Sequence, residues 1–103
     1  MIRRDREIGR DVPVIDLRGA NLRGVLLRGV VLEEGILRGA DLREADFKGA
    51  RMRGVELKDA DLRGADLRDA ELAGADLRGV DLSRAKIRGQ ELTEQQRRES
   101  KRV

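Results

Sequence analysis

Residues 60–79 read ADLRG-ADLRD-AELAG-ADLRG, four versions of one five-residue pattern. The same frame continues without a slip from Ile15 to Glu94, which makes sixteen consecutive units. A leucine or a close equivalent occupies the third position of every unit, an alanine or valine the first position of most, and glycine the fifth position of many. The third-position residues are Leu17, Leu22, Leu27, Leu32, Leu37, Leu42, Phe47, Met52, Leu57, Leu62, Leu67, Leu72, Leu77, Leu82, Ile87 and Leu92. One register therefore governs 80 of the 103 residues.

A period of five suits neither regular element. On an α-helix it advances successive leucines by about 140° and spreads them around the axis. On a β-strand it sends them to alternate faces. Repetition at a fixed short period is instead the signature of a solenoid. The pattern predicts that each unit forms one side of a coil, with its first and third residues inward, its other residues outward, and glycine at the corner, where backbone freedom is needed.

This pattern resembles the motif A(D/N)LXX of the pentapeptide repeat family. The units 20–24 (ANLRG), 40–44 (ADLRE), 60–64 and 75–79 (both ADLRG) satisfy it. The resemblance implies an all-β fold, a right-handed quadrilateral β-helix with four units in each coil and a core column of leucines. Sixteen units would then give about four coils, or roughly 19 Å of rod at the ~4.8 Å spacing of neighbouring strands.

Both ends leave this register. Residues 1–14 include Pro13, which favours an extended chain before it. We expect this segment to be an N-terminal cap or lead-in to the repeat body at 15–94, because a terminal coil exposes core and unpaired backbone. Its aliphatic residues, which could cover that end, are Ile2, Ile8, Val12 and Val14.

Residues 95–103 form a basic C-terminal tail. Thr93 and Gln96 fit a capping box, which predicts a short helical cap from Glu94 to about Arg102. The family resemblance implies homodimers made by an apolar C-terminal helix, but Val103 is the only apolar residue after Leu92. A homodimer is therefore an alternative that this tail does not supply with an interface.

The composition argues against chemistry. The chain has no cysteine and no histidine, which removes disulfides, thiol chemistry and the commonest metal ligands. A convex surface of acids beside arginines implies no catalytic pocket. We expect no enzyme activity, no cofactor and no bound metal. No apolar run has the length of a signal peptide or a membrane span, so we expect a cytoplasmic protein without a membrane partner.

The charge of the repeat body bears on two classes of partner, DNA gyrase and nucleic acids. Residues 15–94 contain 15 basic and 16 acidic residues. An acid precedes most of the leucines and a base follows most of them, which predicts neighbouring columns that neutralise each other. The resembling family includes quinolone-resistance proteins that imitate duplex DNA on gyrase, and such a mimic needs dense negative charge, which this body lacks. Specific nucleic-acid binding is also disfavoured, because every basic column has an acidic neighbour and no exposed aromatic residue offers a stacking platform.

One group of outward positions breaks the polar pattern. Leu26, Val31 and Ile36 occupy the second position of three successive units, where polar or charged residues stand elsewhere. They indicate an interface for a partner protein or a second copy, or a patch that residues 1–14 cover. Together these features predict a non-catalytic, rigid solenoid in the bacterial cytoplasm that serves as a protein-binding or structural scaffold. The alternative, implied by the resemblance alone, is a DNA-mimic modulator of DNA gyrase or topoisomerase.

Overall fold

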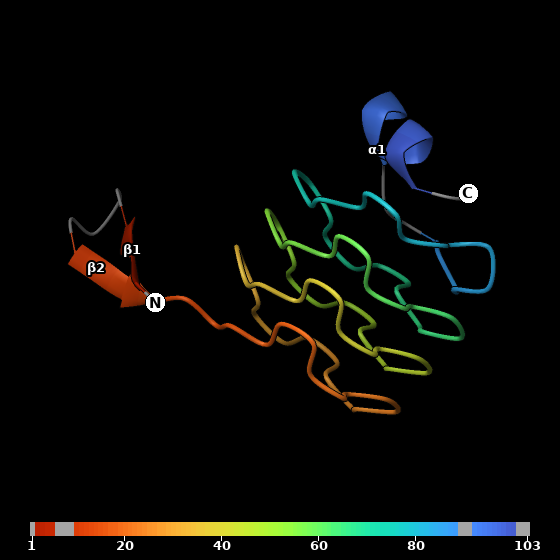
Figure 1. The fold of residues 1–103 in the computed structure, drawn as a ribbon, viewed down its shortest axis with the longest axis horizontal. Helices are drawn as coiled ribbons and strands as arrows, with labels where there is room; N and C mark the ends of the chain where they lie inside the picture. Colours follow the sequence, from red (N-terminus) through yellow and green to blue (C-terminus); the bar gives the residue numbers. More distant parts are fainter. Residues whose placement is uncertain (1, 6–9, 89–91, 101–103) are drawn as a thin grey trace.

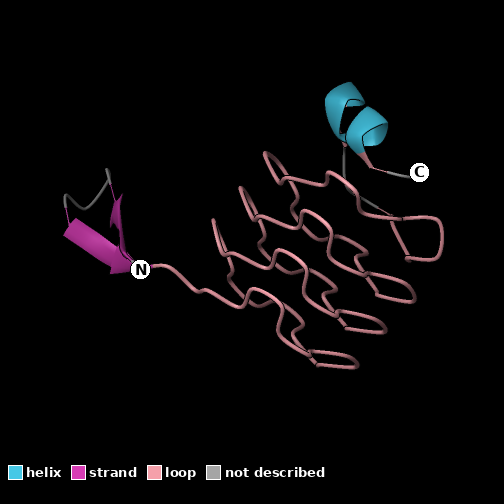
Figure 2. Cartoon of the chain, in the orientation of Figure 1, coloured by secondary structure: helices cyan, strands magenta, loops and turns pink. Residues whose placement is uncertain are grey.

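The structure, a computed structural model, describes residues 2–5, 10–88 and 92–100. From Ile15 onward the chain winds into stacked coils with short sides and tight corners (Figure 1). Isolated parallel β-bridges join residues 20 positions apart, from Asp16 with Ile36 to Asp66 with Lys86. Since each unit has five residues, one coil has four sides. Figure 2 draws these sides as loops because each bridge stands alone and does not extend into a strand.

The stacked sides form four faces of the solenoid. We number them from the side at residues 15–19 (face 1) through 20–24 (face 2) and 25–29 (face 3) to 30–34 (face 4); each face recurs 20 residues further on. Backbone hydrogen bonds join successive coils on every face. For example, the amide of Leu17 donates to the carbonyl of Ile36 at 2.8 Å, and the amide of Asp41 donates to the carbonyl of Ala20 at 2.9 Å. The backbone is therefore satisfied without long strands.

A β-turn makes each corner. The amide of Ala20 donates to the carbonyl of Leu17 at 3.1 Å, and Gly19, the third residue of this turn, has a φ of 67°. A positive φ at this position alone is typical of a type II turn and favours glycine. Acidic residues take the same backbone conformation at four other corners, namely Glu34, Glu44, Asp59 and Asp69.

Three of these acidic side chains lie over a glycine of the next coil. A Cβ atom added to Gly54 or Gly64 would come within 3.1 Å of the glutamate Cγ above it, and one added to Gly79 would overlap the carboxylate above it. The pairs are Glu34 with Gly54, Glu44 with Gly64, and Asp59 with Gly79. Glycine at these positions therefore serves two needs, the positive φ and the space for the neighbouring side chain.

The core is a column of inward side chains. The third-position residues from Leu32 to Leu82 are buried, and so are the small first-position residues between them from Ala40 to Val80. Phe47 and Met52 lie in this column with no exposed surface. The third-position residues nearer the ends are partly buried and pack against the column; these are Leu17, Leu22, Leu27, Ile87 and Leu92. Burial of each leucine stabilises the fold by about 1.5–3 kcal/mol, which supplies the driving force for stacking.

The N-terminal segment contains an antiparallel hairpin (red in Figure 1) that was not predicted from the sequence. Its strands are β1 (Ile2–Asp5) and β2 (Arg10–Pro13), and Ile2 pairs with Pro13. Both are edge strands, where proline is tolerated. The side chains of residues 1–13 lie outside what the structure describes, so the covering role expected of Ile2, Ile8 and Val12 stays a prediction.

The C-terminal segment contains helix α1 (Glu94–Glu99), and the capping box predicted at Thr93 and Gln96 is present. The predicted end at about Arg102 was too late, because Ser100 is already extended. Although α1 has no apolar side chain to bury, Gln96 is only 5% exposed. Its Nε2 donates to the carbonyls of Leu72 at 2.8 Å and Ala75 at 3.0 Å. A polar side chain therefore docks this helix on the solenoid.

Candidate interaction surface

Outward acids and bases are joined locally on faces 1, 2 and 3. The Asp41 Oδ1 accepts hydrogen bonds from the Arg43 amide at 3.2 Å and from Arg43 Nε at 2.9 Å, while Oδ2 accepts from a terminal guanidinium nitrogen at 2.7 Å. We call this arrangement an Asp–Arg bracket. It forms in five units, at Asp16–Arg18, Asp41–Arg43, Asp61–Arg63, Asp66–Arg68 and Asp76–Arg78. The planar guanidinium matches the carboxylate with two parallel bonds.

The backbone part of the bracket explains the second position of the motif. An aspartate or asparagine there can accept a hydrogen bond from the amide two residues on, as in an Asx-turn. The same backbone hydrogen bond forms in three units that have no bracket. Asn21 accepts it from the Arg23 amide at 3.4 Å, Asp46 from the Lys48 amide at 3.1 Å, and Asp81 from the Ser83 amide at 2.9 Å. The short polar side chain therefore stabilises the backbone after it in the units that have aspartate or asparagine at the second position.

The brackets also keep the carboxylates ionised. The side-chain hydrogen bond from Arg43 lowers the pKa of Asp41 to about 2. The equivalent bond from Arg68 lowers the pKa of Asp66 as well. These groups are only partly buried and remain in contact with solvent, so the pairs add little to stability. Their main effect is to neutralise and order the surface of three faces.

Face 4 has no Asp–Arg bracket in any of its described units. Its second positions hold Val31, Arg51 and Glu71, none of which can accept from the amide two residues on in this way. Its outward residues are all exposed, and we call this set the unbracketed face: Val31, Glu33, Glu34, Arg51, Arg53 and Glu71. Within the described part of the chain, neither Arg51 nor Arg53 makes a side-chain ion pair. The bases Arg51 and Arg53 of this face therefore carry charges that no ion pair with a described residue neutralises.

The structure separates the three apolar residues that the sequence grouped. Leu26 lies on face 3 with 82% of its surface exposed, and Val31 lies on face 4 with 56% exposed. Ile36 lies on face 1 between Asp16 and Glu56, and it is only 7% exposed. Ile36 is therefore covered by its own chain, so it cannot contribute an exposed side chain to an interface, whereas Leu26 and Val31 can. Val31 is the member of this group that belongs to the unbracketed face.

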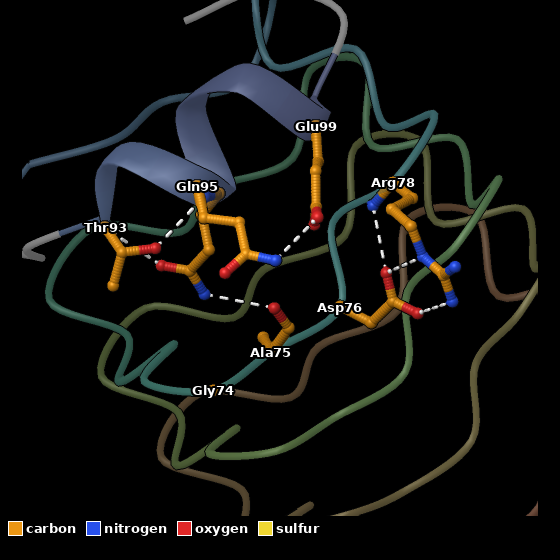
Figure 3. Close-up of a pocket in the computed structure, with 8 residues that line it drawn as sticks. Gly74, Ala75, Asp76, Arg78, Thr93, Gln95 and Glu99 are labelled. Carbon is orange, nitrogen blue, oxygen red and sulfur yellow. Dashed lines mark hydrogen bonds and ion pairs between the residues drawn. The ribbon is translucent and has the colours of Figure 1, made fainter.

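A polar pocket of about 430 Å³ lies against α1, and its lining residues are Gly74, Ala75, Asp76, Arg78, Thr93, Gln95, Gln96 and Glu99 (Figure 3). Its polar side chains bind one another: Gln95 donates to Glu99 at 2.9 Å, and Arg78 brackets Asp76 at 2.6 Å. The hydrogen bond from Arg78 lowers the pKa of Asp76, so this carboxylate is a poor general base. These two contacts lie within α1 and within one unit, and Gln96 links the two sides of the pocket by donating to the Ala75 carbonyl at 3.0 Å.

The described residues contain no group of three or more histidine, cysteine, aspartate or glutamate side chains that could hold a metal ion. No helix among them is long and apolar enough to cross a bilayer.

The charged members of the unbracketed face were not singled out from the sequence. Arranging the sequence in rows of 20 would have shown them, because one column of units then lacks aspartate before its leucine. The sequence pattern did not reveal that face 4 lacks brackets, because Arg51 and Glu71 are charged, as most residues at the second position are.

Comparison with known proteins places this geometry in a family. The model for pentapeptide repeats matches eight copies at residues 15–54 and 56–89. QnrB1, a plasmid-mediated fluoroquinolone resistance protein, is similar in structure, with a TM-score of 0.68 and 28% identity over 79% of this chain and 38% of QnrB1. The pentapeptide repeat protein alr5209 from Nostoc Pcc 7120 is 31% identical over 74% of this chain and 77% of its own, with a TM-score of 0.39. No curated protein matches the sequence. The chain belongs to the pentapeptide repeat family, whose members fold as right-handed β-helices.

Proposed function

We propose that this protein is a non-catalytic scaffold of the cytoplasm that binds another protein through its unbracketed face. The observation that carries the proposal is the contrast between the faces. On faces 1 to 3 five arginines bracket an aspartate of their own unit, whereas face 4 has no bracket in its described units and exposes Arg51 and Arg53 beside Val31. A charged side chain that has no ion pair within its own chain can form one across an interface without breaking another, so the free-energy cost of binding is lower.

The chemistry of the surface supports a binding role over catalysis. The chain has neither histidine nor cysteine. The bracketed carboxylates already accept three or four hydrogen bonds each, and the pKa of Asp41 is lowered to about 2. A group that stays ionised and occupied in this way transfers no proton near neutral pH. A rigid coil stack can instead hold side chains at fixed spacing, which suits recognition.

Modulation of DNA gyrase is a second candidate, and the similarity to QnrB1 favours it. The chain spans 38% of QnrB1, so any shared activity would have to lie in part of that protein's length. Against it stands the surface charge, because the repeat body holds 15 basic and 16 acidic residues and five aspartates are bracketed by arginine. Duplex DNA carries one negative charge per ~1.7 Å of its axis, a density that this surface does not approach.

Capture with matched variants tests the binding proposal. Arg53→Glu reverses a charge on the unbracketed face, and Arg38→Glu makes the same change at an exposed position of face 1. We expect cross-linking in cells of the source organism to recover a protein with the wild type and with Arg38→Glu but not with Arg53→Glu. Recovery that is equal for all three, or absent for all three, would remove the unbracketed face as the binding site.

A supercoiling assay separates the second candidate from the first. Purified protein in excess over gyrase, with and without a quinolone, should leave the enzyme unaffected if the charge argument is right. Inhibition of supercoiling or protection from the quinolone would place the gyrase role first.

A further inference from the structure

The charges of the unbracketed face alternate from coil to coil. The first coil presents Glu33 and Glu34, the second presents Arg51 and Arg53, and the third presents Glu71. Glu33 and Arg53 stand in one column, since they are 20 residues apart. Successive coils lie about 4.8 Å apart, so this column places an acid and a base one step from each other along the rod.

We propose that a second copy of this chain docks on this face, with the two rods antiparallel. The two-fold axis would run along the direction of the sides, between the first and second coils. That operation places Glu33 opposite the partner's Arg53, and Arg53 opposite the partner's Glu33. This inference rests on the proposed function, because it names the partner of the same face.

Self-complementarity favours a second copy over an unrelated protein. A two-fold contact brings the same surface of both molecules together, so one acid–base column supplies two ion pairs. The same operation places Val31 opposite the partner's Arg51, whose aliphatic stem can cover the exposed side chain. Val31 is 56% exposed in the single chain, so this contact also removes apolar surface from water.

The single chain leaves these side chains available. Although Glu33 and Arg53 share a column, no ion pair joins them, and none joins Arg53 to any other described residue. Helix α1 cannot compete as an interface through its inner side, because Gln96 already binds the carbonyls of Leu72 and Ala75. The inner side of α1 is therefore closed to a second copy, whereas the unbracketed face is open to it.

Two charge reversals test the contact. Glu33→Arg leaves two bases in the column and Arg53→Glu leaves two acids, so either variant alone would repel its own copy. In an equimolar mixture, each base of one variant meets an acid of the other. An ion pair within one chain cannot be restored by mixing, so recovery in the mixture reports a contact between chains. Arg38→Glu on face 1 is the control for a charge reversal that spares the contact.

The readout is molar mass by sedimentation equilibrium at millimolar protein in low salt. We expect twice the chain mass of 11.5 kDa for the wild type and for Arg38→Glu, 11.5 kDa for each face variant alone, and twice that mass for their mixture. High salt should return the dimers to single chains, because the pairs are exposed at the rim of the contact. Circular dichroism should show that every variant keeps the wild-type fold.

Three results would overturn the inference. These are a wild type that stays at 11.5 kDa, single variants that still dimerise, and a mixture that does not. A monomeric wild type that still captures another protein through Arg53 would refute the dimer and leave the binding function standing. A monomeric wild type without such capture would refute both.

Discussion

Replacement of Gln96 should release the C-terminal helix from the solenoid. This side chain is 5% exposed and donates to the carbonyls of Leu72 at 2.8 Å and Ala75 at 3.0 Å. The Leu72 carbonyl also accepts from the Ala75 amide at 3.0 Å, so it keeps one partner when Gln96 is shortened. The Ala75 carbonyl loses its only described donor. The two carbonyls therefore contribute unequally to the free energy that is lost when Gln96 is replaced.

The magnitude follows from that difference. A buried acceptor left without a partner costs about 1–3 kcal/mol, and a hydrogen bond lost from a group that keeps another costs about 0.5–1.5 kcal/mol. Gln96 also closes the capping box by accepting from the Thr93 amide at 2.9 Å. Water that enters the space would recover part of the loss. We expect Gln96→Ala to lower the free energy of unfolding by about 2–4 kcal/mol in total.

Urea unfolding with a neighbouring control measures this effect. Gln95→Ala removes one exposed hydrogen bond to Glu99 and should change stability by less than about 0.5 kcal/mol. Hydrogen exchange should show the Gly79 amide, which donates to the Glu99 carbonyl at 3.1 Å, becoming less protected in Gln96→Ala alone. Equal stability of the two variants would refute the docking role of Gln96.

Gln96→Glu sharpens the same test through pH. A carboxylate cannot donate to the two carbonyls, whereas the protonated acid can donate to one. Burial beside these oxygens should raise the pKa of the introduced carboxyl in the folded state above the ordinary value of about 4.3. The stability of this variant should therefore be greatest below that value and fall as the pH rises through the raised pKa. A variant with no pH dependence relative to the wild type would contradict the geometry.

Three other predictions concern the core, a bracket and the helix cap. Leu62→Ala should lower the free energy of unfolding by about 2–5 kcal/mol, whereas Leu26→Ala, at a side chain that is 82% exposed, should have little effect in the same urea titration. Asp41 should titrate near pH 2 by carboxyl NMR, and Arg43→Ala should move its pKa toward 3.8; the contribution of the bracket to stability is thus present above the ordinary pKa and lost as the pH falls through about 2. Thr93→Ala should lower stability by about 1 kcal/mol through loss of the N-cap, measured by thermal unfolding.

The inward pattern could be predicted because packing alone dictates it. Leucine recurs at the third position of every five-residue unit, and a solenoid is the backbone arrangement that can bury all of these leucines. The capping box at Thr93 and Gln96 was predictable for a similar reason, since its bonds span three residues. The hairpin of β1 and β2 was not, because its charged strands carry no alternating apolar pattern.

The candidate surface was less predictable because it depends on what neighbouring positions do to each other. The sequence indicated acidic and basic columns, but the structure places the acid and base of one unit in a bracket, as at Asp66 and Arg68. Whether a charge is used internally depends on the geometry of the turn beside it. For the same reason the position of Ile36 in its unit left open whether it is exposed or covered, and its surroundings bury it.

The acids that lie over glycines set a counting rule for changes in length. Glu34 lies over Gly54 one coil later, and a Cβ atom at that position would come within 3.1 Å of the Glu34 Cγ, so the side chain would have to shift. Deletion of one five-residue unit between them would bring Asp59 beneath Glu34, with two like charges competing for one space. Deletion of a whole coil of 20 residues would bring Gly74 there instead. The residue at this corner is thus matched to the residue one coil below it. We therefore expect the fold to tolerate insertions and deletions here in whole coils rather than in single repeats.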